Sequence, residues 1–60
     1  MNTLKELREA RLLSQDDLAK IAEISPSTLN RIEKGRQEAR WITRRKLAKA
    51  LKVKAEEIQF

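Results

Sequence analysis

The middle of the chain, residues 15–35, contains two short amphipathic patterns with helical spacing, separated by a tight connection at residues 22–25. Each pattern places apolar side chains on one side, and these can meet between two helices that cross steeply. The apolar set consists of Leu18, Ala22, Ile24, Leu29 and Ile32, with Ala19 small enough to allow close approach. The outward side of the second helix is then free to face a partner.

Helix-start and helix-stop signals agree with this interpretation. Ser14 followed by Asp17 is a capping box, which predicts the first of the two helices. Ser25 caps the second helix, and Pro26 is its first residue, where a missing N–H does no harm. Gly35 supplies a left-handed stop. We therefore expect two well-delimited short helices here.

The flanking segments predict further helices. Thr3 followed by Glu6 is another capping box and predicts a helix over about residues 4–11. The string WITRRKLAKAL predicts a fourth helix over about residues 41–51, and we expect a last short helix over residues 55–58. The residues that the fourth helix is expected to bury are Leu47, Ala48 and Leu51.

Composition favours a single helical domain. One glycine and one proline in 60 residues leave little room for strands or hairpin turns. The chain has no cysteine and no histidine, so close helix packing must supply the core, and we expect no metal or other cofactor. The expected fold is all-α, one compact five-helix domain that spans residues 1–60.

Basic residues are concentrated in the second half of the chain. Residues 1–24 carry four basic and five acidic side chains, residues 25–54 carry ten and two, and residues 55–60 carry two acidic side chains. The net charge of +5 therefore comes from the central segment. A basic patch of this kind attracts polyanions such as nucleic acid or an anionic membrane surface.

No segment predicts insertion into a membrane or export. No apolar run approaches the roughly 20 residues that span a bilayer. The acidic and basic residues of MNTLKELREAR exclude a signal peptide. We therefore expect a soluble, cytoplasmic protein.

Nearly the whole chain follows a known pattern. The string LKELREARLLSQDDLAKIAEISPSTLNRIEKGR, followed by KLAKALKVKAEEI, resembles the five-helix DNA-binding domain of the lambdoid phage repressors and Cro-like regulators, the Cro/C1-type helix-turn-helix family. Its most specific parts are Leu13-Ser14-Gln15, Leu18-Ala19, Ile24-Ser25, residues 31–35 and residues 47–51. The resemblance implies that the third helix enters the major groove of DNA while the helix before it lies across the backbone.

A polar stripe on the third helix agrees independently with that role. The stripe consists of Ser27, Asn30, Arg31 and Lys34. These positions follow i, i+3, i+4 and i+7 and lie opposite the apolar side chains. Arg31 is the foremost candidate, because a guanidinium can form two parallel bonds to guanine, worth about 1–3 kcal/mol of discrimination. The base-reading candidates are Pro26, Ser27, Thr28, Asn30 and Arg31, of which the proline can offer only apolar contact.

The resemblance further implies contacts with the DNA backbone. Gln15, the first residue of the helix that precedes the groove-entering one, would clamp a phosphate. Ser25 and Thr28 would lie close enough to the groove wall to donate to a phosphate or a base. The phosphate candidates are Gln15, Ser25, Lys34, Arg36 and Arg40. Such contacts set the affinity and its salt dependence without encoding sequence.

The resemblance also implies an ion pair between Arg8 of the first helix and Glu33 of the third. The spacing agrees, because Arg8 shares the inward face of its helix with Leu4 and Leu7. Glu33 adjoins Ile32 on the buried side, so each charge needs a partner there.

The chain departs from the family pattern at several positions. The family often has glycine at the positions of Leu12, Glu23 and Lys52, so each predicts either a left-handed backbone or a re-routed turn, at a cost of about 1 kcal/mol. Arg44 stands where a leucine is common. Trp41 or Ile42 could then fill the gap in the core.

Plainer explanations stay open for several of these residues. The polar stripe and Gln15 could be ordinary surface positions, and Arg36 and Arg40 are expected to be exposed in either case. The cluster at residues 44–46 could be a nucleic-acid patch, a membrane-surface helix or a solvated face. Asp16 and Asp17 would point roughly 100° apart on a helix and complement its dipole, so we expect no catalytic role and no enzyme.

Four apolar residues exceed what the central helices need, namely Trp41, Ile42, Ile58 and Phe60. Some are expected to complete the core. The others could form a small isologous dimer patch, which would suit a palindromic DNA site whose half-sites lie about 34 Å apart. The same surface could also receive another domain.

The sequence thus predicts a sequence-specific double-stranded DNA-binding transcription regulator, a repressor more than an activator, from a bacterium or its phage. It would place the helix from about Ser25 to Lys34 in the major groove and act as a homodimer on DNA. The alternative is a protein-interaction module of the same fold that docks an antirepressor or a toxin through the same cationic face. A basic membrane-surface binder is a more distant alternative.

Overall fold

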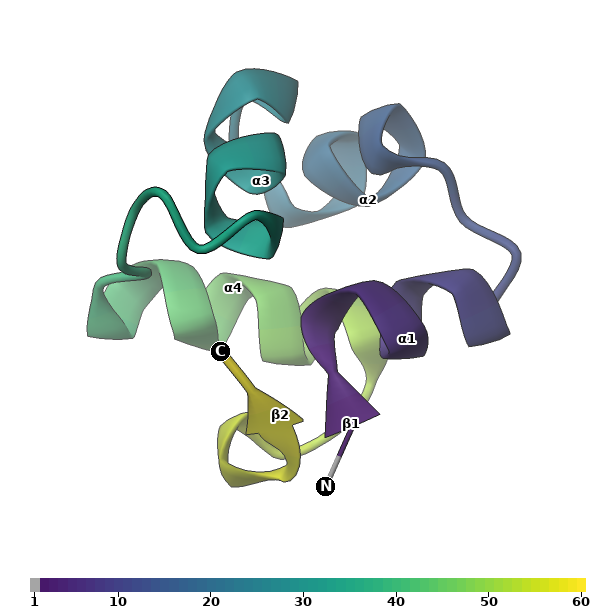
Figure 1. Ribbon diagram of the computed structural model, residues 1–60. Coiled ribbons are helices and arrows are strands. Elements are labelled where there is room, and N and C mark those ends of the chain that lie inside the picture. Colours follow the sequence, from purple (N-terminus) through teal and green to yellow (C-terminus); the bar gives the residue numbers. More distant parts are fainter. Residues whose placement is uncertain (1) are drawn as a thin grey trace.

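Four α-helices and two very short strands make up residues 2–60, the part of the chain that the computed structural model describes (Figure 1). The elements are β1 (Asn2–Thr3), α1 (Leu4–Ala10), α2 (Gln15–Ala22), α3 (Pro26–Glu33), α4 (Trp41–Leu51), the 3₁₀ turn η1 (Ala55–Glu57) and β2 (Ile58–Gln59). The predicted helices at the centre of the chain are confirmed. In the view of Figure 1, α3 runs down the page and α2 runs across it, with α4 below both.

Reciprocal capping boxes determine where α1 and α2 begin. The Thr3 hydroxyl accepts from the Glu6 N–H at 3.1 Å, and the Glu6 carboxylate accepts from the Thr3 N–H at 2.8 Å. Ser14 and Asp17 form the same pair of bonds, each 3.0 Å long. Each carboxylate accepts a hydrogen bond from a backbone N–H, which stabilises its charged form. The pKa of Glu6 and the pKa of Asp17 are therefore lowered below their ordinary values.

The starts of α3 and α4 differ from each other. The Ser25 Oγ accepts from the Thr28 N–H at 3.1 Å, and Pro26 occupies the first helical position of α3. The residue that precedes α4 is Arg40, and its side chain makes no capping hydrogen bond. The N–H groups of the first turn of α4 therefore receive no side-chain cap.

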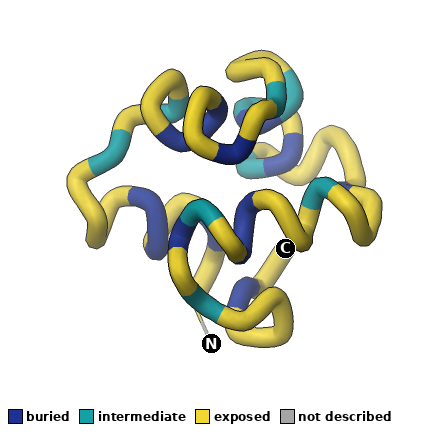
Figure 2. The backbone as a smooth tube through the Cα atoms, turned by 180° about the vertical axis from the view of Figure 1, so that it is seen from behind, coloured by how far each residue is buried: buried dark blue, intermediate teal, exposed yellow. Residues whose placement is uncertain are grey.

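The core lies where the helices face one another, as the buried positions in Figure 2 show. Leu18, Leu29, Leu47 and Leu51 are its largest fully buried side chains, contributed by α2, α3 and α4. The remaining buried apolar residues are Leu4, Leu7, Ala19, Ala22, Ile32, Ala39, Ala48 and Ile58. Ile24, which was expected in the buried set, is half-buried and packs against it, as does Leu13. The apolar spacing of the sequence thus defines the core.

The described chain is mostly helical, as expected, but it has four α-helices and no fifth one. Residues 55–57 form a single 3₁₀ turn, and Ile58 begins a strand. This strand pairs in parallel with β1, so that Asn2 lies opposite Ile58 and Thr3 opposite Gln59. The pairing ties the C-terminal segment to the start of α1 and buries the β-branched Ile58, which a continuing helix would turn away from β1.

Three residues that replace the family's glycines have left-handed backbones, so the turns are not re-routed. The φ angles are 56° at Leu12 and 59° at both Glu23 and Lys52, close to the 72° of Gly35. Each of these three residues follows a helix and ends it. Since a side chain in this region costs about 1 kcal/mol, the chain accepts strain at three helix ends.

The expectation that Trp41 or Ile42 would fill the core gap beside Arg44 is wrong. Trp41 is 71% exposed and Ile42 is 51% exposed, while Ala39 is buried. The Arg44 Nε donates to the Ala39 carbonyl at 2.8 Å, and its guanidinium lies 5.0 Å from the centre of the Phe60 ring. Arg44 and Phe60 therefore stack on each other beside Ala39, where Trp41 or Ile42 was expected to fill the core. Figure 1 shows the C-terminus lying below α4.

No helix among residues 2–60 combines the length and the apolar character needed to cross a bilayer.

Candidate nucleic-acid interface

The outer side of α3 presents a polar stripe to solvent. Ser27, Arg31 and Lys34 are exposed, and Asn30 is half-buried. On the opposite side of the same helix, Leu29 and Ile32 are buried in the core. The helix is therefore amphipathic in the sense expected from the sequence, and its polar stripe is accessible to a partner.

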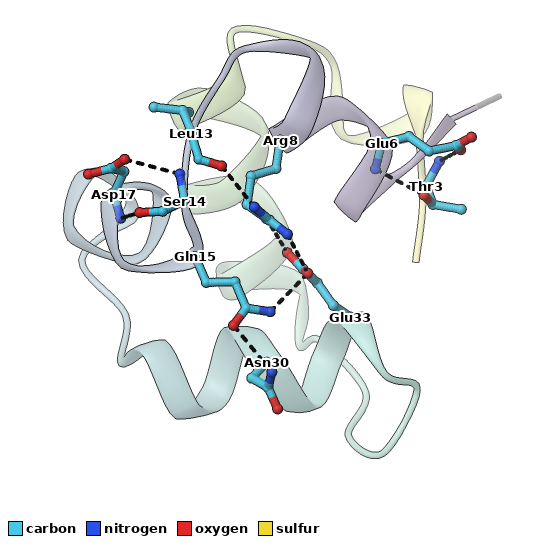
Figure 3. A network of polar contacts seen from close by, with 9 residues as sticks. All are labelled: Thr3, Glu6, Arg8, Leu13, Ser14, Gln15, Asp17, Asn30 and Glu33. Atoms are coloured by element: carbon cyan, nitrogen blue, oxygen red, sulfur yellow. Dashed lines mark hydrogen bonds and ion pairs between the residues drawn. The ribbon is translucent and has the colours of Figure 1, made fainter.

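An ion pair anchors the last turn of α3 to α1 (Figure 3). The Arg8 guanidinium forms two parallel bonds to the Glu33 carboxylate, from Nε at 2.8 Å and from Nη2 at 3.1 Å. Its third group, Nη1, donates to the Leu13 carbonyl at 2.8 Å. The Glu33 side chain is only 3% exposed, and the hydrogen bond to it raises the pKa of Arg8. Such a buried, fork-like pair restricts both position and rotation.

Gln15 extends this network to the polar stripe of α3. Its Nε2 donates to the Glu33 carboxylate at 3.0 Å, and its Oε1 accepts from the Asn30 amide at 3.2 Å (Figure 3). The first residue of α2 is thus bonded to the middle and to the end of α3. The sequence singles out all three residues but does not reveal their mutual bonds, because separations of 15 and 18 residues give no periodic signal.

Two hydroxyl groups lie together at the N-terminus of α3. The Ser25 Oγ accepts from the backbone of Thr28 and donates its own proton to Thr28 Oγ1 at 2.8 Å. The proton of the Thr28 hydroxyl is therefore available to an external acceptor. The exposed ring of Pro26 lies between these residues in the chain.

Three exposed cations lie at the end of the stripe and in the segment that follows it. Lys34 ends α3, Arg36 lies in the loop after Gly35, and Arg40 precedes α4. The single ion pair found among residues 2–60 is Arg8–Glu33, so none of these cations is neutralised by a carboxylate of the described chain. The loop that carries them lies beside α3 in Figure 1. Their charge is available to an anionic partner.

The described residues contain no cluster of three or more residues that could hold a metal ion. No buried side-chain nitrogen or oxygen among them lacks a hydrogen-bond partner.

Comparison with known proteins agrees with this geometry. A family model described as helix-turn-helix matches residues 4–58. The chain belongs to the Cro/C1-type helix-turn-helix family of DNA-binding transcription regulators.

Among solved structures, the chain is similar to the restriction-modification controller protein C.AhdI from Aeromonas hydrophila. The two are 35% identical with a TM-score of 0.88, over 90% of this chain and 82% of that protein. No curated protein matches the chain significantly.

Proposed function

We propose that this protein binds a specific double-stranded DNA site in the bacterial or phage cytoplasm with α3 in the major groove, and that it thereby represses transcription. The observation that carries the proposal is the polar stripe of α3 on a helix anchored from behind by Glu33 and Arg8. A helix that enters the groove must hold its side chains in register with the base edges, and this anchor supports that register. The similarity to a restriction-modification controller protein supports a regulatory role.

In this proposal, sequence is read from the N-terminal and central part of α3. Arg31 is exposed and can donate two parallel bonds to a guanine. Asn30 uses one amide N–H for Gln15, which leaves its Oδ1 and its second N–H for the edge of an adenine. Ser27 and Thr28 supply hydroxyl groups, and Pro26 supplies an apolar surface for a thymine methyl.

The backbone of the DNA is held by a second group of residues. Gln15 has one amide N–H left after donating to Glu33, and it can donate this to a phosphate. Ser25 lies at the N-terminus of α3, where the helix dipole favours an anion. Lys34, Arg36 and Arg40 add charge that sets the affinity in a salt-dependent way.

We further propose that two copies bind one palindromic site. Trp41 is 71% exposed at the start of α4, and it offers an apolar surface for an isologous contact. Two recognition helices related in this way would read half-sites about 34 Å apart.

The test begins by selecting bound fragments from random duplex DNA and titrating the selected site at two salt concentrations, about 50 and 200 mM. A steep loss of affinity for the duplex as the salt concentration rises supports DNA binding. A protein that binds only other proteins would show no binding to the duplex. Arg31→Ala should flatten the preference between sequences, whereas Lys34→Ala and Arg36→Ala should weaken binding to all of them alike. Lys20→Ala, an exposed cation of α2 outside the proposed interface, is the matched control.

Two outcomes would contradict the assigned roles. Equal loss on every duplex after Arg31→Ala would remove its base-reading role. A selected motif without two-fold symmetry would contradict the proposed dimer. Repression itself is measured by transcription in vitro from a promoter that overlaps the selected site, where added protein should reduce the transcript.

A further inference from the structure

A groove with an apolar floor lies between the end of α2 and one side of α4. Its volume is about 540 Å³. The apolar lining comes from Ile21 and Ala22 of α2 and from Ile42 and Ala50 of α4. Ile21 is 55% exposed and Ile42 is 51% exposed, so both isoleucines present large apolar surfaces to solvent. Covering two exposed isoleucines that line a concavity is favourable, because it removes their apolar surface from water.

The rim of this groove is strongly cationic. Arg45, Lys46, Lys49 and Lys52 line it, against a single acidic residue, Glu23. None of the four cations forms an ion pair within residues 2–60, where the one such pair is Arg8–Glu33. The rim therefore holds concentrated positive charge that the described chain does not balance.

The groove is separate from the proposed DNA interface. None of the residues named there as base-reading or phosphate candidates lines it. A phosphate backbone would satisfy the cations but would leave the isoleucines exposed. A bilayer surface is reached by apolar side chains that protrude, whereas these line a concavity. The combination of apolar floor and cationic rim instead matches a ligand that is apolar on one side and acidic on both flanks.

We propose that this groove binds an acidic amphipathic helix of a partner protein. The apolar residues of such a helix, at i, i+3, i+4 and i+7, would lie on Ile21 and Ile42, in the manner of other helix-in-groove complexes. Its flanking carboxylates would face Lys46 and Lys49, which steer the encounter and fix the orientation. Because the DNA interface stays uncovered, the regulator can hold DNA and this partner at the same time. The inference does not depend on which DNA sequence is read.

The test is a titration of the ¹⁵N-labelled 60-residue protein with a designed helical peptide, followed by amide chemical shifts. The peptide carries leucines at i, i+3, i+4 and i+7 and glutamates on its flanks. A second peptide has the same composition with the leucines out of phase. We expect shifts concentrated at the groove residues of α2 and α4, and binding of the out-of-phase peptide that is at least about tenfold weaker.

Variants separate the two parts of the site. Ile21→Ala should weaken binding of the in-phase peptide about tenfold, while Leu12→Ala, at a residue 92% exposed outside the groove, should not. Lys49→Glu should weaken it, while Lys5→Glu, the same charge change on α1, should have a much smaller effect. The spectrum of each variant reports its folding directly, and unaltered DNA binding by Ile21→Ala shows that the two surfaces are distinct.

Four outcomes overturn the proposal. Equal binding of both peptides would show only non-specific charge attraction, and absence of localised shifts would show no site. Shifts of the groove residues on adding duplex DNA or anionic lipid vesicles would assign the cations to those ligands. Concentration-dependent changes at the groove without peptide would assign it to a second copy of the chain.

Discussion

α3 and α4 are held in the fold by different kinds of interaction. α3 begins at a side-chain cap and ends at a buried ion pair, and Gln15 bonds to two of its residues. α4 has no side-chain cap, and it is held mainly by the burial of Leu47, Ala48 and Leu51, with one side-chain hydrogen bond from Arg44 to the Ala39 carbonyl. Burial is non-directional, whereas hydrogen bonds and ion pairs have a required geometry. The helix proposed to read bases is thus the one whose orientation is specified most completely.

The largest expected effect comes from breaking the anchor of α3. Glu33→Ala leaves the Arg8 guanidinium buried without its carboxylate, which typically costs about 3–5 kcal/mol of unfolding free energy. A domain of 60 residues has only about 3–9 kcal/mol in total. The substitution should therefore remove a large part of the stability of the domain. Urea unfolding followed by circular dichroism measures the difference.

Glu38→Ala is the control, because Glu38 is an exposed loop carboxylate that forms no ion pair. It should change stability by no more than about 0.5 kcal/mol. A Glu33→Ala protein with the same unfolding curve as the parent would show that the anchor does not stabilise the fold.

A smaller effect distinguishes the two helix starts. Ser25→Ala removes the hydroxyl that accepts the Thr28 N–H, and it should lower the unfolding free energy by about 1 kcal/mol. Arg40→Ala, at the equivalent position before α4, removes no cap and should change it by less than about 0.5 kcal/mol. Thermal melts of the two variants make the comparison. Equal losses would mean that α4 depends on a cap that the structure does not contain.

The helix ends offer an effect of opposite sign. Lys52→Gly removes the Cβ from a residue with a φ of 59°, so it should raise stability by up to about 1 kcal/mol. Lys46→Gly, inside the exposed part of α4, should lower stability by about 0.5–1 kcal/mol. Measuring both in urea isolates the backbone effect from loss of the side chain. A destabilised Lys52→Gly would show that the left-handed conformation carries no strain.

Local signals explain how much of α2, α3 and α4 could be predicted from the sequence. The bounds of α2 and α3 follow from local signals, namely Ser14 with Asp17, and Ser25 with Pro26 and Gly35, which act within one turn of the chain. The apolar spacing also predicted the buried residues of α4. For the candidate site, the exposed stripe of α3 follows from helical spacing, and the Arg8–Glu33 pair followed from the family resemblance.

The errors lie where distant segments meet. Nothing near Ile58 indicates that it pairs with Asn2, so the strand was predicted as the end of a helix. Arg44 covers its corner through Ala39 and Phe60, a solution that apolar spacing alone does not reveal. The bonds of Gln15 to α3 were missed for the same reason. Contacts between segments far apart in sequence depend on the assembled fold and leave no periodic trace.

The smallest expected effect concerns pH and the capping box of α2. The Ser14 N–H that Asp17 accepts lowers the pKa of this carboxyl below its ordinary 3.8. Because the folded-state pKa is lower than the unfolded one, the contribution to stability is present above pH 3.8 and is lost as the pH falls through the folded value. Asp17→Asn resembles the protonated side chain at every pH. It should therefore be less stable than the parent near neutral pH, and the difference should shrink in acid.

Urea unfolding at about pH 7 and about pH 2.5 measures that change in the difference. Asp16→Asn is the matched control, since Asp16 is also in the first turn of α2 but makes no capping hydrogen bond. A difference between Asp17→Asn and the parent that stays constant with pH would mean that the charged carboxylate adds nothing beyond its shape. The cap at the start of α2 would then come from the Ser14 hydroxyl, which accepts the Asp17 N–H, and the charge of the Asp17 carboxylate would add nothing to it.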